Sequence, residues 1–107
     1  MRKVLVISQD PLIGKLFMSL SEDFMIDISI VPDLKRGVLK IEKGACEAVI
    51  VSVPLSSEPC PRNILRAVQA VREDIPIYFL MNQLDISEAI HLTKLGAEFC
   101  YCRPFAL

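Results

Sequence analysis

The amino-acid sequence predicts an α/β domain, a three-layer sandwich in which helices cover both faces of a five-stranded parallel sheet. Short apolar segments rich in β-branched residues alternate along the chain with segments whose apolar residues recur at helical spacing. Strands that alternate with single helices are joined by right-handed crossovers, which makes their sheet parallel. A chain of 107 residues has room for one domain, so we assign residues 1–107 to it.

Five segments have the pattern of strands. Three of them are almost continuously apolar, as strands covered on both faces should be: Lys3–Ile7, Glu47–Val53 and Pro76–Met81. The segment Met25–Val31 alternates between apolar and polar residues, which favours a strand nearer the edge of the sheet. Phe99–Cys102 is the last predicted strand.

The first two predicted helices have recognisable ends. Asp10 and Pro11 supply an N-cap and a proline at the first helical position, so we predict a helix over residues 11–23. Asp33 caps a second helix, and Gly44 ends it.

The last two helices are predicted from the spacing of their apolar residues and from the residues that begin and end helices. Pro59 and Pro61 exclude regular structure in the loop before the third helix. Its apolar positions are Ile64, Leu65, Val68 and Val71. Asp85 and Glu88 form a capping-box pattern for the fourth helix, which stops at Gly96. Its expected inward residues are Ile86, Ala89, Ile90 and Thr93.

Charge and hydropathy exclude several classes of function. The chain has 12 Lys and Arg against 13 Asp and Glu, so we expect neither nucleic acid nor an anionic membrane as a partner. No apolar run approaches the roughly 18 residues of a membrane span. The N-terminus MRKVLVIS lacks the features of a signal peptide, so we expect a cytoplasmic protein.

The four cysteines are expected to stay reduced in that compartment. Cys100 and Cys102 form C-x-C rather than the C-x-x-C of redox and zinc sites. We interpret these two, with Cys46 and Cys60, as small hydrophobic residues, and a metal or disulfide role is the less favoured alternative.

In parallel α/β sheets, ligand sites lie beyond the carboxyl ends of the strands, where the strand order reverses. The candidate site residues are therefore those that follow the predicted strands. They are Ser8, Gln9, Asp10, Ser52, Met81, Asn82 and Arg103. The loops after the strands contain no glycine-rich phosphate cradle.

Four segments together resemble the receiver domains of two-component response regulators, the CheY-like family. They are KVLVISQDPLI, EAVIVS, PIYFLMN and LGAEFCYCRPF, in the family's order and spacing. The resemblance covers essentially the whole chain. It implies a CheY-like or flavodoxin-like fold with strand order 2-1-3-4-5.

The residues that perform the family's chemistry are replaced. The acidic pair that holds Mg²⁺ in receivers corresponds to Ser8 and Gln9, and the phosphoryl-accepting aspartate corresponds to Ser52. Met81 stands at the position of a hydroxyl residue, and Arg103 at that of the signalling lysine. Because Mg²⁺ prefers hard oxygen ligands that include carboxylates, we expect no Mg²⁺ and no other cofactor.

The polar residues that remain have simple structural interpretations. A serine hydroxyl such as that of Ser52 is a weak nucleophile, and no nearby carboxylate except Asp10 is placed to activate it. We interpret Ser52 as a locally hydrogen-bonded strand-end serine. Asp10 is interpreted as a helix N-cap, with pairing to Arg103 as the alternative. Arg103 is also a candidate for binding an anion, and His91 is interpreted as a half-exposed helical residue.

Two further positions follow from the resemblance. Cys100 corresponds to the aromatic switch residue of receivers, and Pro104 to a proline that follows a cis peptide bond. Met81 is expected to fill apolar volume under the site.

The predicted function is that of a pseudo-receiver: a non-phosphorylatable signalling domain of a two-component or phosphorelay-type protein, and not an enzyme. It is expected to bind a protein partner or a second receiver-like chain. The expected surfaces are the fourth helix and fifth strand, over residues 87–101, or an uncovered face of the sheet. The alternative is an anion- or small-molecule-binding domain, or a small enzyme, that uses Ser52 and Arg103.

The C-terminal end of the sequence gives one more expectation. Receivers continue past Lys-Pro-Phe into a fifth helix, whereas this sequence stops at Phe105-Ala106-Leu107. We therefore expect the final helix to be missing and part of one sheet face to be exposed. Either the chain is cut from a longer protein, or a second chain covers the face in a dimer.

Overall fold

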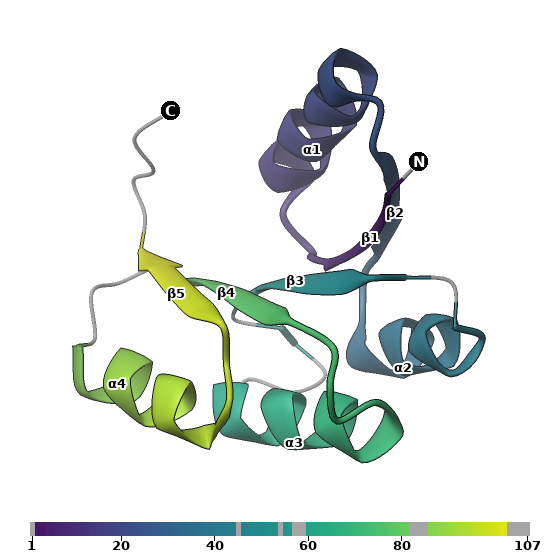
Figure 1. Ribbon diagram of the computed structural model, residues 1–107. Helices are drawn as coiled ribbons and strands as arrows, with labels where there is room; N and C mark the ends of the chain where they lie inside the picture. Colours follow the sequence, from purple (N-terminus) through teal and green to yellow (C-terminus); the bar gives the residue numbers. More distant parts are fainter. Residues whose placement is uncertain (1, 45, 54, 57–59, 82–85, 103–107) are drawn as a thin grey trace.

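The computed structural model describes residues 2–44, 46–53, 55–56, 60–81 and 86–102. Strands and helices alternate along them (Figure 1). In chain order they are β1 (Lys3–Ile7), α1 (Pro11–Phe24), β2 (Asp27–Val31), α2 (Leu34–Glu42), β3 (Ala48–Ser52), α3 (Pro61–Val71), β4 (Ile77–Met81), α4 (Ile86–Leu95) and β5 (Phe99–Cys102).

The five strands form one parallel sheet in the order β2-β1-β3-β4-β5, which confirms the predicted strand order. The order reverses direction at β1, because β1 has β2 on one side and β3 on the other. The carboxyl end of β1 therefore lies at the position where ligands bind in open parallel sheets.

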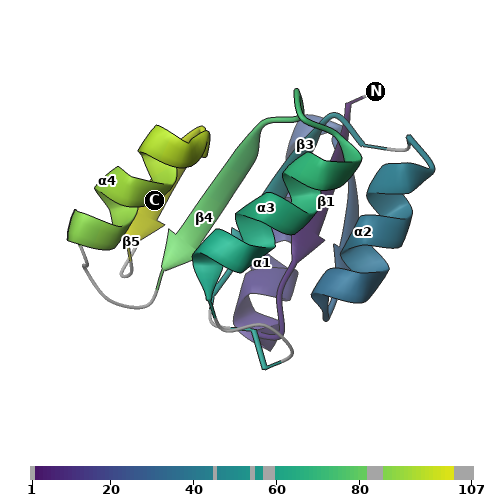
Figure 2. The same cartoon turned by 90° about the horizontal axis from the view of Figure 1, so that it is seen from below.

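Helices cover the two faces of the sheet unequally. Helix α1 lies alone on one face, while α2, α3 and α4 form a layer on the other (Figures 1 and 2). The larger apolar core lies under that layer of three helices, with Phe79 as its largest fully buried side chain. A smaller cluster around Val6, Ile13 and Leu80 lies under α1.

The face that carries α1 is exposed at the β5 edge. Phe99 and Tyr101 alternate with Cys100, which packs toward the larger core, so the two aromatic side chains lie on the α1 face. Their rings contact each other with centroids 4.7 Å apart, and the side chains are 54% and 47% exposed. Among the described helices α1 alone lies on this face (Figure 1).

Several predicted boundaries are wrong by one or two residues: β3 is Ala48–Ser52 rather than 47–53, and β4 begins at Ile77 rather than at residue 76. Two others have a clear physical reason. Strand β2 begins at Asp27 rather than at residue 25, because Met25 has φ 54° and ends α1 with a left-handed cap. Helix α3 begins at Pro61 itself, since proline lacks only an N–H that the first turn does not use. Asp85, the predicted cap of α4, lies outside the described residues.

The predicted inward face of α4 is also wrong. Leu92 is the residue buried against the sheet, whereas Ile86 and Ile90 are 61% and 51% exposed and Thr93 is exposed. The sheet ends at β5, so side chains on the outer side of α4 have no strand to pack against. None of the helices in the described part of the chain is long and apolar enough to cross a membrane.

Candidate functional site

The register of the sheet brings three predicted site residues together. Ile7 of β1 pairs with Val51 of β3, so Ser8, which follows β1, and Ser52, the last residue of β3, lie at neighbouring strand ends. Ser52 pairs with Leu80, which places Met81 one residue beyond on β4. We call Ser8, Gln9, Asp10, Ser52 and Met81 the strand-end site. The ends of β1, β3 and β4 therefore meet as the sequence predicts.

The hydroxyl groups of the strand-end site are buried. Ser8 is 6% exposed and Ser52 is 4% exposed, and Met81 is buried beside them. Ser8 Oγ accepts a hydrogen bond from the backbone N–H of Asp10 at 3.1 Å. The Ser8 side chain therefore shapes the turn from β1 into α1 and is not directed at solvent.

Asp10 is the helix N-cap that the sequence predicts. Its Oδ1 accepts a hydrogen bond from the backbone N–H of Leu12 at 2.9 Å, and its carbonyl accepts one from Gly14. A carboxylate at this position also interacts favourably with the positive end of the α1 dipole. The one acidic side chain of the strand-end site thus has a structural use at the start of α1.

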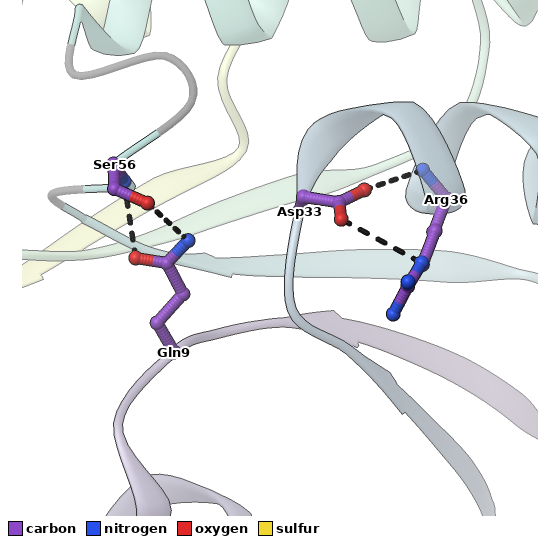
Figure 3. Close-up of polar contacts among 4 residues, drawn as sticks. All are labelled: Gln9, Asp33, Arg36 and Ser56. Carbon is purple, nitrogen blue, oxygen red and sulfur yellow. Dashed lines mark hydrogen bonds and ion pairs between the residues drawn. The ribbon is translucent and has the colours of Figure 1, made fainter.

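Gln9 joins two loops across the site. Its Nε2 donates to Ser56 Oγ at 2.8 Å, and its Oε1 accepts from the backbone N–H of Ser56 at 3.0 Å (Figure 3). Gln9 follows β1, and Ser56 lies in the loop between β3 and α3. These two hydrogen bonds, which we call the Gln9–Ser56 clasp, join the loop after β1 to the loop after β3.

The chemistry available at the strand-end site is limited by its side chains. Apart from the Asp10 carboxylate, the site offers two hydroxyls, one amide and one thioether. In the described part of the chain, no three His, Cys, Asp or Glu residues are grouped so that they could hold a metal ion. The sole histidine of the sequence, His91, is exposed on α4, as expected, and activates no serine here.

Three predicted residues lie outside the described residues: Asn82, Arg103 and Pro104. The predicted pairing of Asp10 with Arg103 and the cis peptide bond before Pro104 stay predictions. Cys100, the predicted switch position, is half-buried, and its Sγ lies 4.0 Å from the carbonyl oxygen of Ala89. It therefore contacts α4 rather than the strand-end site.

The predicted protein-binding edge contains an open groove between α4 and β5. The groove has a volume of about 470 Å³ and is lined by Ala89, Ile90, Thr93, Lys94, Phe99 and Cys100. Ile90 is about half exposed there. We call this the α4/β5 groove. Its walls are mostly apolar, with Lys94 as the charged side chain.

Sequence reasoning missed Ser56 and the outward isoleucines of α4. Ser56 lies in a loop without periodicity, so no pattern marks it as the partner of Gln9. The exposure of Ile90 could in part have been predicted from the sequence. Ile86 and Ile90 share one helical face with Lys94, and a fully buried face would not include a lysine.

No family model matches this sequence, and no curated protein matches it either. The fold, in contrast, is similar to solved structures. A two-component response regulator from Clostridium difficile has a TM-score of 0.88 at 15% identity, over 99% of this chain and 86% of that one. The non-phosphorylated HemR receiver domain from Leptospira biflexa has a TM-score of 0.88 at 17% identity, over 99% and 85% of the two chains.

A further similar structure is a receiver dimer. The beryllofluoride-activated NtrC4 receiver domain dimer has a TM-score of 0.89 at 17% identity, over 99% of this chain and 87% of that one. Identities this low establish architecture alone. The chain therefore has the fold of response regulator receiver domains, with five parallel strands in the order 2-1-3-4-5.

Proposed function

We propose that this chain is a receiver-like signalling domain that takes no phosphoryl group at its strand-end site and acts by binding another protein. The observation that carries the proposal is the strand-end site itself. Ser52 replaces an aspartate at the end of β3 and is buried, and the two residues that follow β1 are a serine and a glutamine. A receiver needs carboxylates at these positions to hold Mg²⁺.

The Gln9–Ser56 clasp supports the same conclusion. Gln9 stands where a receiver has a metal-binding carboxylate, and here its amide is engaged by Ser56 through two hydrogen bonds. Those hydrogen bonds link the loops that flank the strand ends. We infer that these hydrogen bonds within the chain connect the two loops in place of a bound metal ion.

A buried Ser52 is also unfavourable for the alternative, in which an anion or small molecule binds beside it. With 4% of its surface exposed, Ser52 offers little contact to a ligand arriving from solvent. Non-enzymatic signalling is therefore the function we propose.

Amide NMR spectra test the phosphoryl part of the proposal. We expect no concerted shifts at Ser52 and Met81 when Mg²⁺ and beryllofluoride are added to the wild-type chain. A matched variant, Ser8→Asp/Gln9→Asp/Ser52→Asp, restores three carboxylates, so Mg²⁺ should raise its melting temperature by binding the folded state. Concerted wild-type shifts at the strand ends would contradict the proposal, and shifts with sulfate alone would favour the anion-binding alternative.

Protein binding is proposed for the edge formed by α4 and β5. Exposed apolar side chains there belong to both elements: Ile86, Ile90, Leu95, Phe99 and Tyr101. The residues of α4 lie on one face of the sheet, and Phe99 and Tyr101 lie on the other, so the edge exposes apolar side chains on both faces. Exposed apolar patches mark interaction surfaces in soluble domains.

Light scattering and a hydrophobic dye test this second part. We expect the chain either to self-associate or to bind the dye, and the variant Ile90→Asp/Phe99→Asp to lose that behaviour. The matched control Leu12→Asp/Met18→Asp removes exposed apolar residues of α1 and should keep it. A stable monomer that binds no dye contradicts a binding edge.

A further inference from the structure

The helices α2 and α3 carry an uneven share of the positive charge. Residues 33–43 and 61–71 contain six Lys and Arg and two Asp and Glu, a net charge of +4. The rest of the sequence contains six Lys and Arg and eleven Asp and Glu, a net charge of −5. The total of −1 therefore conceals two regions of opposite sign.

These cations lie on the exposed sides of two neighbouring helices. Helices α2 and α3 pack against each other in the layer that Figure 2 shows from the helix side. Their exposed cations are Lys35, Arg36, Lys40, Lys43, Arg62 and Arg66. We call this surface the basic face. It is distinct from the α4/β5 groove.

Lys40 in the last turn of α2 and Lys43 at its C-cap interact favourably with the helix dipole, but helix stability does not explain the cations in the first turns of α2 and α3. Neither α2 nor α3 has an acidic residue in its first turn, and Lys35, Arg36 and Arg62 lie there. Positive charge at a helix N-terminus opposes the helix dipole. Arg36 and Lys40 are also like charges four residues apart, which lowers helix stability further.

Most of the charges on the basic face lack an internal counterion. Arg36 pairs with Asp33 at 3.6 Å and Arg62 pairs with Glu88 at 3.7 Å. Within the described residues, Lys35, Lys40, Lys43 and Arg66 form no ion pair. Four cationic side chains therefore remain available to an external anion.

An exposed leucine lies among the lysines. Leu39 is 49% exposed and follows Lys35 by one helical turn, and Lys43 follows Leu39 by another. A ligand that satisfies both side-chain types needs negative charge on either side of an apolar group. An Asp- or Glu-rich peptide with a large apolar side chain has that chemistry.

We propose that the basic face binds an acidic peptide segment of a partner protein, with Leu39 contacting its apolar side chain. Nucleic acid fits less well. No aromatic residue lies in α2 or α3 to stack on a base, and the acidic remainder of the chain repels a polyanion that extends beyond the face.

The proposal does not depend on the phosphoryl chemistry of the strand-end site. Its test uses the whole chain and a fluorescein-labelled synthetic peptide in which leucines alternate with pairs of glutamates. The variant Lys35→Glu/Lys40→Glu/Lys43→Glu reverses three exposed charges of α2. Since an exposed ion pair contributes modestly, we expect the three reversals to weaken peptide binding by about tenfold or more.

The matched control is Arg2→Glu/Lys3→Glu/Lys15→Glu, which has the same change of net charge on exposed residues outside both the basic face and the α4/β5 groove. It should bind the peptide like the wild type in physiological salt, because charges farther away than a Debye length are screened. Leu39→Ser should weaken binding without changing its salt dependence. A version of the peptide with glutamine in place of glutamate should not bind.

Three results would overturn the proposal. One is equal loss of binding in the α2 variant and its matched control. Another is duplex DNA binding the wild type more tightly than the peptide does, and losing that binding in the α2 variant. The third is wild-type self-association, seen by light scattering, that the α2 variant abolishes.

Discussion

At the carboxyl ends of β1 and β3, the polar side chains are buried or hydrogen-bonded, and loops are joined across the site by Gln9 and Ser56. At the edge formed by α4 and β5, large apolar side chains are exposed beside an open groove. Receivers use the first region for chemistry. The difference shows that the strand ends are closed by contacts within the chain, whereas the α4/β5 edge presents apolar side chains to solvent.

The largest effect we predict separates packing from binding at the α4/β5 edge. Leu92→Ala removes a fully buried side chain and should lower the free energy of unfolding by about 2–5 kcal/mol. Ile90→Ala, two residues away on the exposed side, should change it by less than about 0.5 kcal/mol. Urea unfolding measures both. Equal losses would mean that the outer side of α4 is packed and is not a free binding surface.

A second prediction concerns the turn that positions β5 against α4. Gly96 has φ 117°, and a Cβ there would lie 2.5 Å from Gln69 Nε2, which donates to the carbonyl of Leu95. Gly96→Ala should therefore cost about 1–3 kcal/mol of unfolding free energy.

Gly44→Ala is the matched control for that variant. Gly44 also has positive φ, at 69°, but nothing lies within 4 Å of the position of its Cβ, so only the backbone cost of about 1 kcal/mol applies. If both substitutions lower the unfolding free energy by the same amount, the contact with Gln69 does not hold the turn.

A smaller effect on stability is predicted at the strand-end site, for the Gln9–Ser56 clasp. Gln9→Ala removes two exposed hydrogen bonds and should lower the unfolding free energy by about 0.5–1.5 kcal/mol. The Ser56 amide should then exchange its hydrogen faster. In Gln9→Glu, the carboxylate can accept from both the N–H and the O–H of Ser56, so slow exchange should be retained. Unchanged Ser56 exchange in Gln9→Ala would show that the clasp does not join the loops.

The smallest effect involves a thiol remote from both regions. Burial raises the pKa of the Cys46 thiol, and the positive charge of nearby Arg72 offsets this only in part. The folded state thus holds this proton more tightly than the unfolded state. Its contribution to stability is complete below the unfolded pKa and is lost as pH rises above about 8.5.

Unfolding experiments between neutral and alkaline pH measure this loss. The variant Cys46→Ala cannot titrate at this position, so its stability should fall less steeply over the same pH range. Identical pH dependence in the two proteins would show that Cys46 does not contribute.

Much of the fold follows from the sequence because apolar periodicity decides where strands and helices form. The continuous runs of β1, β3 and β4 and the capping Asp10 and Asp33 are local signals, and the structure confirms them. Met25 was misassigned because a left-handed cap depends on how α1 ends and not on β propensity.

The rest depends on contacts between distant residues. The exposed side of α4 results from the sheet ending at β5, and the partner of Gln9 lies 47 positions further along the chain. The basic face was not predicted because the positive charge of α2 and α3 and the negative charge of the remaining sequence nearly cancel, which leaves a net charge of −1. The strand ends and the cap formed by Asp10 could be predicted from the sequence, whereas the hydrogen bonds between Gln9 and Ser56 could not.

Intact mass spectrometry after incubation with Mg²⁺ and a small phosphodonor tests the central claim most directly. An aspartate-bearing receiver serves as the positive control under the same conditions. For this chain we predict an unchanged mass, because Ser52 is buried and a serine hydroxyl is a weak nucleophile unless a base activates it. A mass increase of one phosphoryl group that disappears in Ser52→Ala would contradict the account.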